Sequence, residues 1–284
     1  MQKVRIITHS GCDISFHEAE KNQITMIPDF VIFGTEQYRN NLDILPDTFY
    51  QRLSDCEKLP TSAHPSLADY MDAFRSASDY DEIIFIALTS KMTGAYNSAC
   101  LAAQLLEEEG FPVKIHVYDS LQVSFGAAIL VFEAARMARE GADAAAIMKQ
   151  LDALVPRIGV YFVLKTLKYA HKGGRVGAIS ALATDSLGVK PLLVFDNGTV
   201  SDLHLNRTLK HAIQSIFKKY ESLASDDSEV YIFHACNEKG ALSLKKLIQD
   251  TYPDIHPRIE YVGPVLGIYT GIGCVGIAFR KKDV

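Results

Sequence analysis

Three polar turns contain the residues whose types and spacing suit the binding of an anion. The first turn, Leu88–Gly94, follows an apolar run of strand length and precedes a predicted helix. Thr93 offers a hydroxyl there, Gly94 lets a ligand approach the backbone, and the free N–H groups at the start of a helix favour negative charge. On spacing alone, simple capping of the helix by Thr93 is the commoner role of such a residue.

Two further turns add hydroxyls and a guanidinium. Pro60–Ser66 contains Thr61 and Ser62, although clusters of Ser, Thr and Pro usually form ordinary loops. His64 in this turn is interpreted as a surface histidine rather than a ligand. The third turn, Lys172–Arg175, places a guanidinium beside two glycines. That arrangement suits bidentate binding of a carboxylate or phosphate, and a solvated surface turn explains it equally well.

The sequence lacks the common motifs of catalysis and of cofactor binding. It contains no G-x-S-x-G elbow, no phosphate-binding G-x-x-x-x-G-K-[ST], no H-E-x-x-H, and no G-x-G-x-x-G after the first strand. The five cysteines form no C-x-x-C pair and no cluster with histidine, which predicts reduced thiols and no metal site. Hydroxyls, N–H groups and one arginine can bind an anion without transforming it. We therefore expect a binding protein with no catalytic residue, no metal and no cofactor.

The elements that must position these turns alternate between strand and helix in the first half of the chain. Ile83–Leu88 is a continuous apolar run, Ala95–Glu108 has helical periodicity, and Val113–Tyr118 reads as the next strand. This order is a βαβ unit, which predicts a parallel sheet whose strand ends carry the ligand site. The other expected elements of this half are strands at Val4–Thr8 and Ile24–Phe33, and helices at Ser66–Ala77 (with a capping box), Gly126–Glu140 and Asp143–Val155.

The pattern changes after Pro156 to one typical of a mixed sheet. Leu192–Phe195 and Thr199–Leu205 flank an Asn-Gly turn, which is a strong hairpin signal. The other expected elements are strands at Ile158–Leu164 and Val230–His234, and helices at Thr208–Leu223 and Lys239–Tyr252. We predict an α/β fold with two domains, residues 1–157 around a mainly parallel sheet and residues 158–284 around a mixed sheet.

Composition excludes several classes of partner. The 284 residues carry a formal net charge of −5, with 48% apolar and 22% charged residues, so nothing suggests binding to nucleic acid. The segment Tyr261–Phe279 contains no charged residue and is long enough to span a membrane. However, its five glycines and Pro264 disfavour a continuous helix. We interpret it as a buried strand, a glycine loop and a second buried strand. No secretory signal precedes the first strand, so we expect a cytoplasmic protein without a transmembrane segment.

Six segments follow one another in an order that matches a known family pattern. They are Ile7–Ser10 with Asp13, Thr61-Ser62, Ser90–Ala99, Asp119-Ser120 with Ser124 and Gly126, Leu167–Gly177 with Lys190-Pro191, and Gly263–Gly267. Together they span nearly the whole chain and resemble the motifs of the DegV family of fatty-acid-binding proteins. The chain departs from that pattern at His9, which replaces an aspartate, and at Tyr269, which replaces a histidine.

The resemblance implies a long-chain fatty acid, such as palmitate or oleate, enclosed between the two domains. Its carboxylate would be held by Thr61 and/or Ser62 and by Thr93, with Gly94 lending its backbone and Arg175 near the same head group. In relatives that present their fatty acid to a separate kinase, the histidine replaced here by Tyr269 lies near that head group. Burial of a C16 tail, at about 0.8 kcal/mol per methylene, would supply roughly 10 kcal/mol before ordering costs.

Three hypotheses follow from the resemblance and the turns. The leading hypothesis is a non-enzymatic carrier of a long-chain fatty acid. Transient contact of the carrier with a membrane is compatible with this hypothesis. The alternative is the substrate-binding subunit of a two-component fatty acid kinase system that takes part in acyl-phosphate formation with a separate fatty acid kinase. His171, Lys172 and Arg175 motivate this alternative. A ligand-gated interaction protein is a third class, for which no amphipathic helix stands out.

Overall fold

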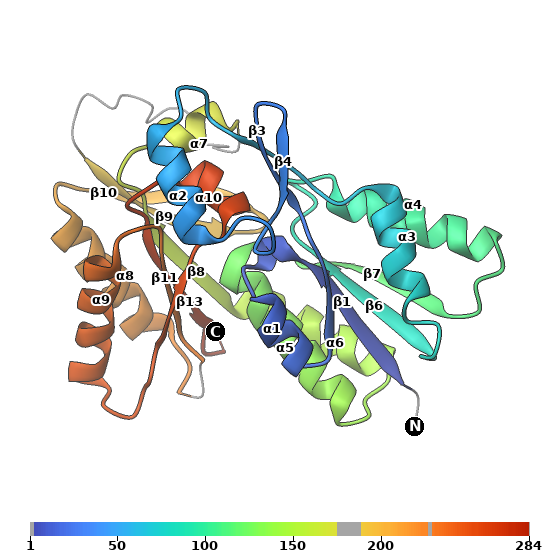
Figure 1. Ribbon diagram of the computed structural model, residues 1–284. Helices are drawn as coiled ribbons and strands as arrows, with labels where there is room; N and C mark the ends of the chain where they lie inside the picture. Colours follow the sequence, from blue (N-terminus) through green and yellow to red (C-terminus); the bar gives the residue numbers. More distant parts are fainter. Residues whose placement is uncertain (1–2, 175–188, 227–228, 284) are drawn as a thin grey trace.

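The computed structural model describes residues 3–174, 189–226 and 229–283 and arranges them in alternating layers of helices and sheets (Figure 1). The first sheet is parallel, with strand order β2-β1-β6-β7. Its central strands are near-continuous runs of buried residues, as a parallel sheet covered on both faces requires. The predicted parallel sheet is therefore confirmed. Its strands are β1 (Val4–His9), β2 (Ile24–Ile27), β6 (Glu82–Ala87) and β7 (Lys114–Asp119).

Helices cover both faces of the parallel sheet. α3 (Leu67–Arg75) and α4 (Ala95–Glu108) pack on one face, and α5 (Ser124–Arg139) and α6 (Ala144–Leu154) pack on the other (Figure 1). α3 begins at the predicted capping box. Ser66 Oγ accepts from the Asp69 N–H at 3.2 Å, and Asp69 Oδ2 accepts from the Ser66 N–H at 2.8 Å. Two otherwise unpaired donors at the start of the helix are thereby satisfied.

A small antiparallel sheet and several short helices were not predicted from the sequence. The expected extended stretch Ile24–Phe33 is divided near Pro28, and its second part forms an antiparallel sheet of strand order β4-β3-β5. These elements are β3 (Phe30–Phe33), β4 (Glu36–Arg39), β5 (Thr61–Ala63), α1 (Phe16–Lys21) and α2 (Pro46–Asp55), with 3-10 turns at Ser10–Cys12 and Val155–Arg157.

The second sheet is mixed, as predicted, with strand order β10-β9-β8-β13-β11-β12. Only β11 and β12 run parallel among its described pairs, and the predicted hairpin turns at Asn197-Gly198. α8 and α9 cover its outer face (Figure 1). The elements are β8 (Ile158–Val163), β9 (Lys190–Asp196), β10 (Thr199–Asn206), β11 (Tyr231–His234), β12 (Arg258–Tyr261), β13 (Val275–Arg280), α7 (Lys168–Lys172), α8 (Leu209–Leu223) and α9 (Glu238–Thr251).

The interpretation of the uncharged segment Tyr261–Phe279 as a strand, a loop and a second strand is wrong in the middle of the segment. A helix, α10 (Pro264–Thr270), lies between β12 and β13. Gly263 is its N-cap and Pro264 occupies its first turn, where a proline has a suitable φ and no N–H to leave unpaired. Gly267 faces α2, because a Cβ there would stand 2.6 Å from Phe49 Cε1. Within the described ranges, the helices include none that is long and apolar enough to cross a bilayer.

Helix α5 lies between the two sheets and contacts both. One side packs against β1, and the other packs against β8 and β13. Its residues from Ser124 to Val131 are all buried, which explains why the helix is apolar around its circumference. Gly126 permits the close approach to β8, because a Cβ there would lie 2.8 Å from Val160 Cγ2. One hydrophobic core therefore includes residues of both halves, and the division at residues 157 and 158 stays a prediction.

Candidate functional site

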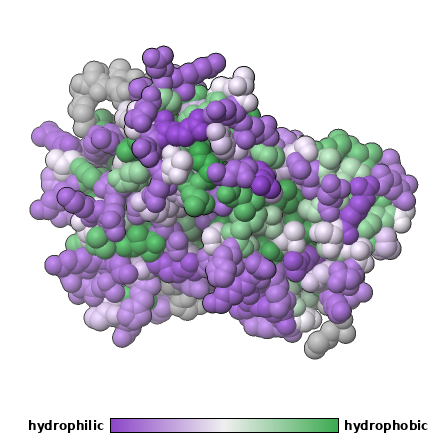
Figure 2. Space-filling view, in the orientation of Figure 1, coloured by the Kyte–Doolittle hydropathy of each residue, from purple (hydrophilic) through white to green (hydrophobic). Residues whose placement is uncertain are grey.

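A cavity of about 460 Å³ lies between the two sheets, where the parallel strands β1 and β6 end. This is the edge of the sheet at which the sequence predicts a ligand site. Its volume is in the range of small-molecule pockets. Figure 2 shows hydrophobic residues reaching the surface near the middle of the face shown in Figure 1, between hydrophilic regions.

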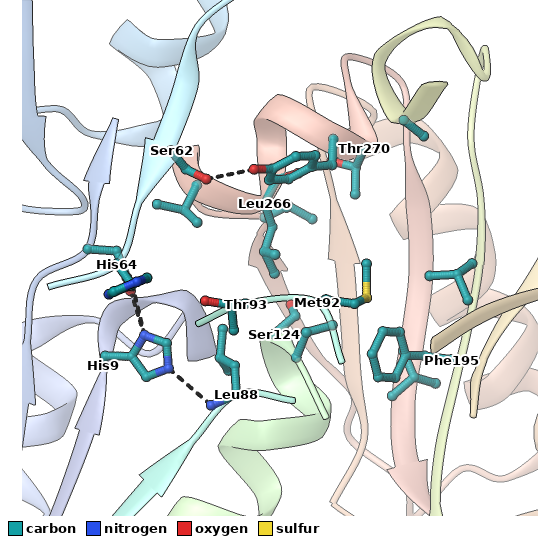
Figure 3. A pocket seen from close by; sticks show the side chains of 18 of the residues that line it. His9, Ser62, His64, Leu88, Met92, Thr93, Ser124, Phe195, Leu266 and Thr270 are labelled. Carbon is teal, nitrogen blue, oxygen red and sulfur yellow. Dashed lines mark hydrogen bonds and ion pairs between the residues drawn. The ribbon is translucent and has the colours of Figure 1, made fainter. Parts of the chain in front are cut away.

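The two ends of the cavity differ in polarity. His9 and His64 lie on one side of the cavity, Phe195 lies on the other, and Thr93 and Met92 lie between them (Figure 3). The mixed sheet contributes apolar side chains, and α10 contributes apolar side chains together with two hydroxyls. A cavity with one polar and one apolar end fits an amphiphile. The apolar lining is Ala63, Leu88, Met92, Val123, Val160, Phe162, Leu164, Ala170, Leu193, Phe195, Val200, Phe233, Val262, Val265 and Leu266, and the polar lining is His9, Asp29, Ser62, His64, Ser90, Thr93, Asn97, Ser124, Tyr269 and Thr270, with Gly94.

The structure brings together four of the six residues predicted for the site. Ser62, Thr93, Gly94 and Tyr269 all line the cavity. Thr61 does not, because it is exposed on β5 and side chains on a strand point alternately to opposite faces. Of the alternatives Thr61 and Ser62, the geometry favours Ser62. Arg175 lies outside the described residues.

Thr93 and Gly94 stand at the start of α4. Gly94 is the N-cap, so the helix has no side chain in the usual capping position. The Ala95 N–H donates to Thr93 Oγ1 at 3.3 Å, and the same hydroxyl group lines the cavity. Thr93 therefore has both roles that its spacing suggests, a contact with the helix start and access to a ligand. The dipole of this 14-residue helix favours an anion at that point.

A hydrogen bond across the cavity joins β5 to α10. The hydroxyls of Ser62 and Tyr269 lie 2.7 Å apart (Figure 3). Their residues are 207 positions apart in the sequence, so this bond closes one side of the cavity between the two halves of the chain. One of these hydroxyls donates to the other, and the hydroxyl that accepts still has its own proton to donate to a carboxylate oxygen.

The cavity contains a buried histidine–aspartate pair that the sequence analysis missed. His9 Nδ1 lies 2.8 Å from Asp29 Oδ1, and the Leu88 N–H donates to His9 Nε2 at 3.0 Å. Since an N–H can only donate, Nε2 must be an acceptor and the proton of the neutral ring must be on Nδ1. Asp29 also accepts from the Gly11 N–H at 2.7 Å. The position of His9 at the carboxyl end of a strand is the signal that could have identified it.

His64 also lines the cavity, which its interpretation as a surface histidine did not anticipate. The ring is half-buried, and its Nδ1 lies 2.8 Å from the Pro65 carbonyl oxygen, which can only accept. The proton of that bond is therefore on Nδ1, and Nε2 faces the start of α4. A Cβ built at Gly94 would be 3.1 Å from Nε2. The sequence carried no signal for this role, because a histidine before a proline is common in surface turns.

The buried carboxyl group of Asp13 joins Ser124, which lines the cavity, to the start of α10. Ser124 Oγ donates to Asp13 Oδ2 at 2.6 Å, and the Gly263 N–H donates to Asp13 Oδ1 at 3.1 Å. Burial raises the pKa of Asp13 to about 7, against the opposite influence of these two donors. Asp13 and Ser124 both have left-handed backbone conformations, with φ of 60° and 51°. Such strained residues persist where the surrounding structure holds them.

Further hydrogen bonds join the two halves of the chain near the cavity. On one side, the Val265 N–H donates to Asn40 Oδ1 at 3.2 Å and Tyr50 OH donates to the Val262 carbonyl at 2.9 Å. On the other side, Thr89 Oγ1 donates to the Gly198 carbonyl at 3.1 Å, which places the hairpin turn on the loop before α4. The described part of the chain holds no cluster of three or more potential metal ligands. The site can bind an acidic amphiphile by hydrogen bonding and apolar burial.

Comparison with known proteins identifies relatives along nearly the entire chain. A DegV domain-containing protein of Halalkalibacterium halodurans is 30% identical over 283 residues, which cover 98% of this chain and 99% of the relative. The solved structure of DegV from Bacillus subtilis, described as a fatty acid binding protein, superposes with a TM-score of 0.88 at 27% identity and covers 99% and 100% of the two chains.

A second solved structure, a stearic acid-binding protein from Eubacterium ventriosum, has a TM-score of 0.87 at 28% identity and covers 99% of both chains. The family model described as "Uncharacterised protein, DegV family" matches residues 3–282. The resemblance in the six motifs and the α/β fold class are thereby confirmed. The chain belongs to the DegV family.

Proposed function

We propose that this protein binds one long-chain fatty acid in the cavity between its two sheets and acts as a carrier rather than as a catalyst. The observation that carries the proposal is the polarity of the lining: hydroxyls and the start of α4 at one end, and aliphatic and aromatic side chains at the other. The solved relatives described as fatty acid binding proteins support the same ligand class.

The carboxylate is held at the polar end. Thr93 and one member of the Ser62–Tyr269 pair donate hydrogen bonds from their hydroxyls, and Gly94 lends its backbone beside the start of the helix. A contribution from Arg175 remains a prediction.

Tail burial supplies most of the affinity. About 14 methylenes of a C16 chain at about 0.8 kcal/mol each give about 11 kcal/mol, from which association and ordering costs of several kcal/mol are subtracted. With an association cost of about 4 kcal/mol, about 7 kcal/mol remains from the tail, so the expected dissociation constant for palmitate or oleate is about 10 µM or lower once the head-group hydrogen bonds are added. Presentation of the bound lipid to a separate fatty acid kinase stays a prediction.

The test is native mass spectrometry and lipid extraction of the freshly purified protein, followed by delipidation and titration with palmitate and oleate. A bound mass of a few hundred daltons that is recovered as free fatty acid is the expected result. A lipid-free protein whose melting temperature does not rise with either fatty acid refutes the proposal.

Two neighbouring positions on β10 provide a matched pair of variants. Val200 lines the cavity, and the adjacent Thr199 does not. Val200→Trp is expected to fill the apolar end and to lower fatty-acid affinity at least about tenfold, which corresponds to loss of about two buried methylenes. Thr199→Trp adds the same bulk to the same edge strand with little effect on affinity. Equal loss in both variants would mean that the tail does not occupy this cavity.

A further inference from the structure

The polar end of the cavity contains few side chains that can carry positive charge. Among the described residues that line the cavity, lysine and arginine are absent, and only His9 and His64 can become cations. A carboxylate taken out of water is stabilised most by a charged donor. The identity of that cation therefore determines how firmly an acidic head group is held and how this depends on pH.

The hydrogen bonds of His9 exclude it from this role. Both of its ring nitrogens are already engaged, Nδ1 with the Asp29 carboxylate and Nε2 with the Leu88 N–H. Protonation of His9 Nε2 would place its N–H opposite the Leu88 N–H at 3.0 Å, so that two hydrogen-bond donors would face each other in a buried site. His9 can thus remain neutral and structural while a ligand occupies the cavity.

The hydrogen bonds of His64 permit protonation. Nδ1 donates to the Pro65 carbonyl in either charge state, which leaves Nε2 to receive a proton and to donate it in a hydrogen bond. Nε2 stands next to the Gly94 backbone at the start of α4. The helix dipole, the hydroxyl of Thr93 and the imidazolium would converge on the same anion.

We propose that His64, as an imidazolium, is the charged partner of the ligand carboxylate, so that the protein holds its fatty acid more tightly as pH falls. The proposal rests on the proposed function and specifies how that site recognises and releases an acidic lipid. The titratable groups that face His64 are His9 on β1, Asp29 before β3, Tyr70 on α3 and Tyr269 on α10. Asp29 is engaged by His9, and burial raises the pKa of Tyr70.

The experiment measures palmitate affinity of the full chain and of His64→Gln at pH 6 and pH 8. Glutamine keeps a polar side chain of similar reach but carries no charge, and imidazoles ordinarily change charge between pH 5 and 8. The ratio of the variant's dissociation constant to that of the unmodified protein is expected to be about ten at pH 6 and about two or less at pH 8. Taking this ratio cancels the protonation of the free fatty acid.

Two comparisons isolate the charge interaction. His211→Gln removes an exposed histidine from α8 and is expected to leave the affinity unchanged at both pH values. For 1-hexadecanol, which has the same chain and no carboxylate, the ratio of the dissociation constants of His64→Gln and the unmodified protein is expected to stay constant with pH. If palmitate binds tightly and the ratio for His64→Gln does not change between pH 6 and pH 8, the role of His64 is refuted while the lipid site stands. If neither lipid binds, the proposed function itself fails.

Discussion

Replacement of Asp13 by asparagine tests whether the buried carboxyl near the cavity is protonated in the folded protein. Burial raises the pKa of Asp13 to about 7, whereas an aspartate in the unfolded chain has a pKa of about 3.9. The folded state therefore binds the proton more tightly than the unfolded state. The stability contributed by this group is fully present below about pH 4 and is lost as pH rises through about 7.

The size of the effect follows from that difference. One pKa unit corresponds to about 1.4 kcal/mol. The contribution of Asp13 to the free energy of unfolding therefore falls by at most about 4 kcal/mol between pH 4 and pH 8. Asparagine fits the same place, because its oxygen accepts from the Gly263 N–H and its amide donates to Ser124 Oγ. At pH 8 we expect Asp13→Asn to be more stable than the unmodified protein by about 2–4 kcal/mol.

The assay is urea unfolding of both lipid-free proteins at pH 4.5, 6, 7 and 8. Subtracting the unfolding free energy of the unmodified protein from that of Asp13→Asn isolates the effect of Asp13 from that of the other groups that titrate in this pH range. It is expected to grow with pH, and Asp79→Asn, at an exposed position, is expected to show no such trend. A variant that is less stable than the unmodified protein at pH 8 would refute the reasoning, because it would mean that the fold requires the carboxylate.

Three further substitutions have defined outcomes. Glu133 is buried, and Arg136 and Arg280 lower its pKa despite burial, so Glu133→Gln is expected to cost about 2–3 kcal/mol at pH 7. That cost should fall towards zero in denaturation experiments near pH 3. Ser66→Ala removes the capping box and is expected to cost about 1 kcal/mol in thermal unfolding, with Ser66→Thr nearly neutral. Gly198→Ala places a side chain at φ 78° against the Thr89 hydroxyl; we expect a loss of about 1–2 kcal/mol and faster fatty-acid release in stopped-flow measurements.

Local signals in the sequence were sufficient where a segment's own chemistry decides its structure. The turn at Asn197-Gly198, with both φ values positive, specifies the hairpin, and Ser66 with Asp69 specifies the start of α3. α2 carries a local signal of the same kind that was overlooked, because Pro46 stands at its first position and its apolar residues fall on one side of the helix.

Structure that depends on distant partners could not be derived in this way. The segment of α10 reads as a loop because of its glycines, but contact of Gly267 with Phe49 and Tyr50 holds it as a helix. Motif resemblance located the α4 end of the cavity through Thr93 and Gly94. His64 and the pair of His9 with Asp29 became apparent only when β1, β5 and α4 were placed together.

The position of α5 between the two sheets has a consequence for ligand exchange. A clamshell that opens about a hinge would pull α5 away from either β1 or β8 and expose its apolar residues to water. For the proposed fatty-acid ligand we therefore expect loading and unloading by local displacement of β5 and α10, which the hydrogen bond between Ser62 and Tyr269 joins across the cavity. Because one core includes residues of both halves, we expect them to melt in one cooperative transition, and we expect the exchange rate of the lipid to depend on a few local contacts rather than on global stability.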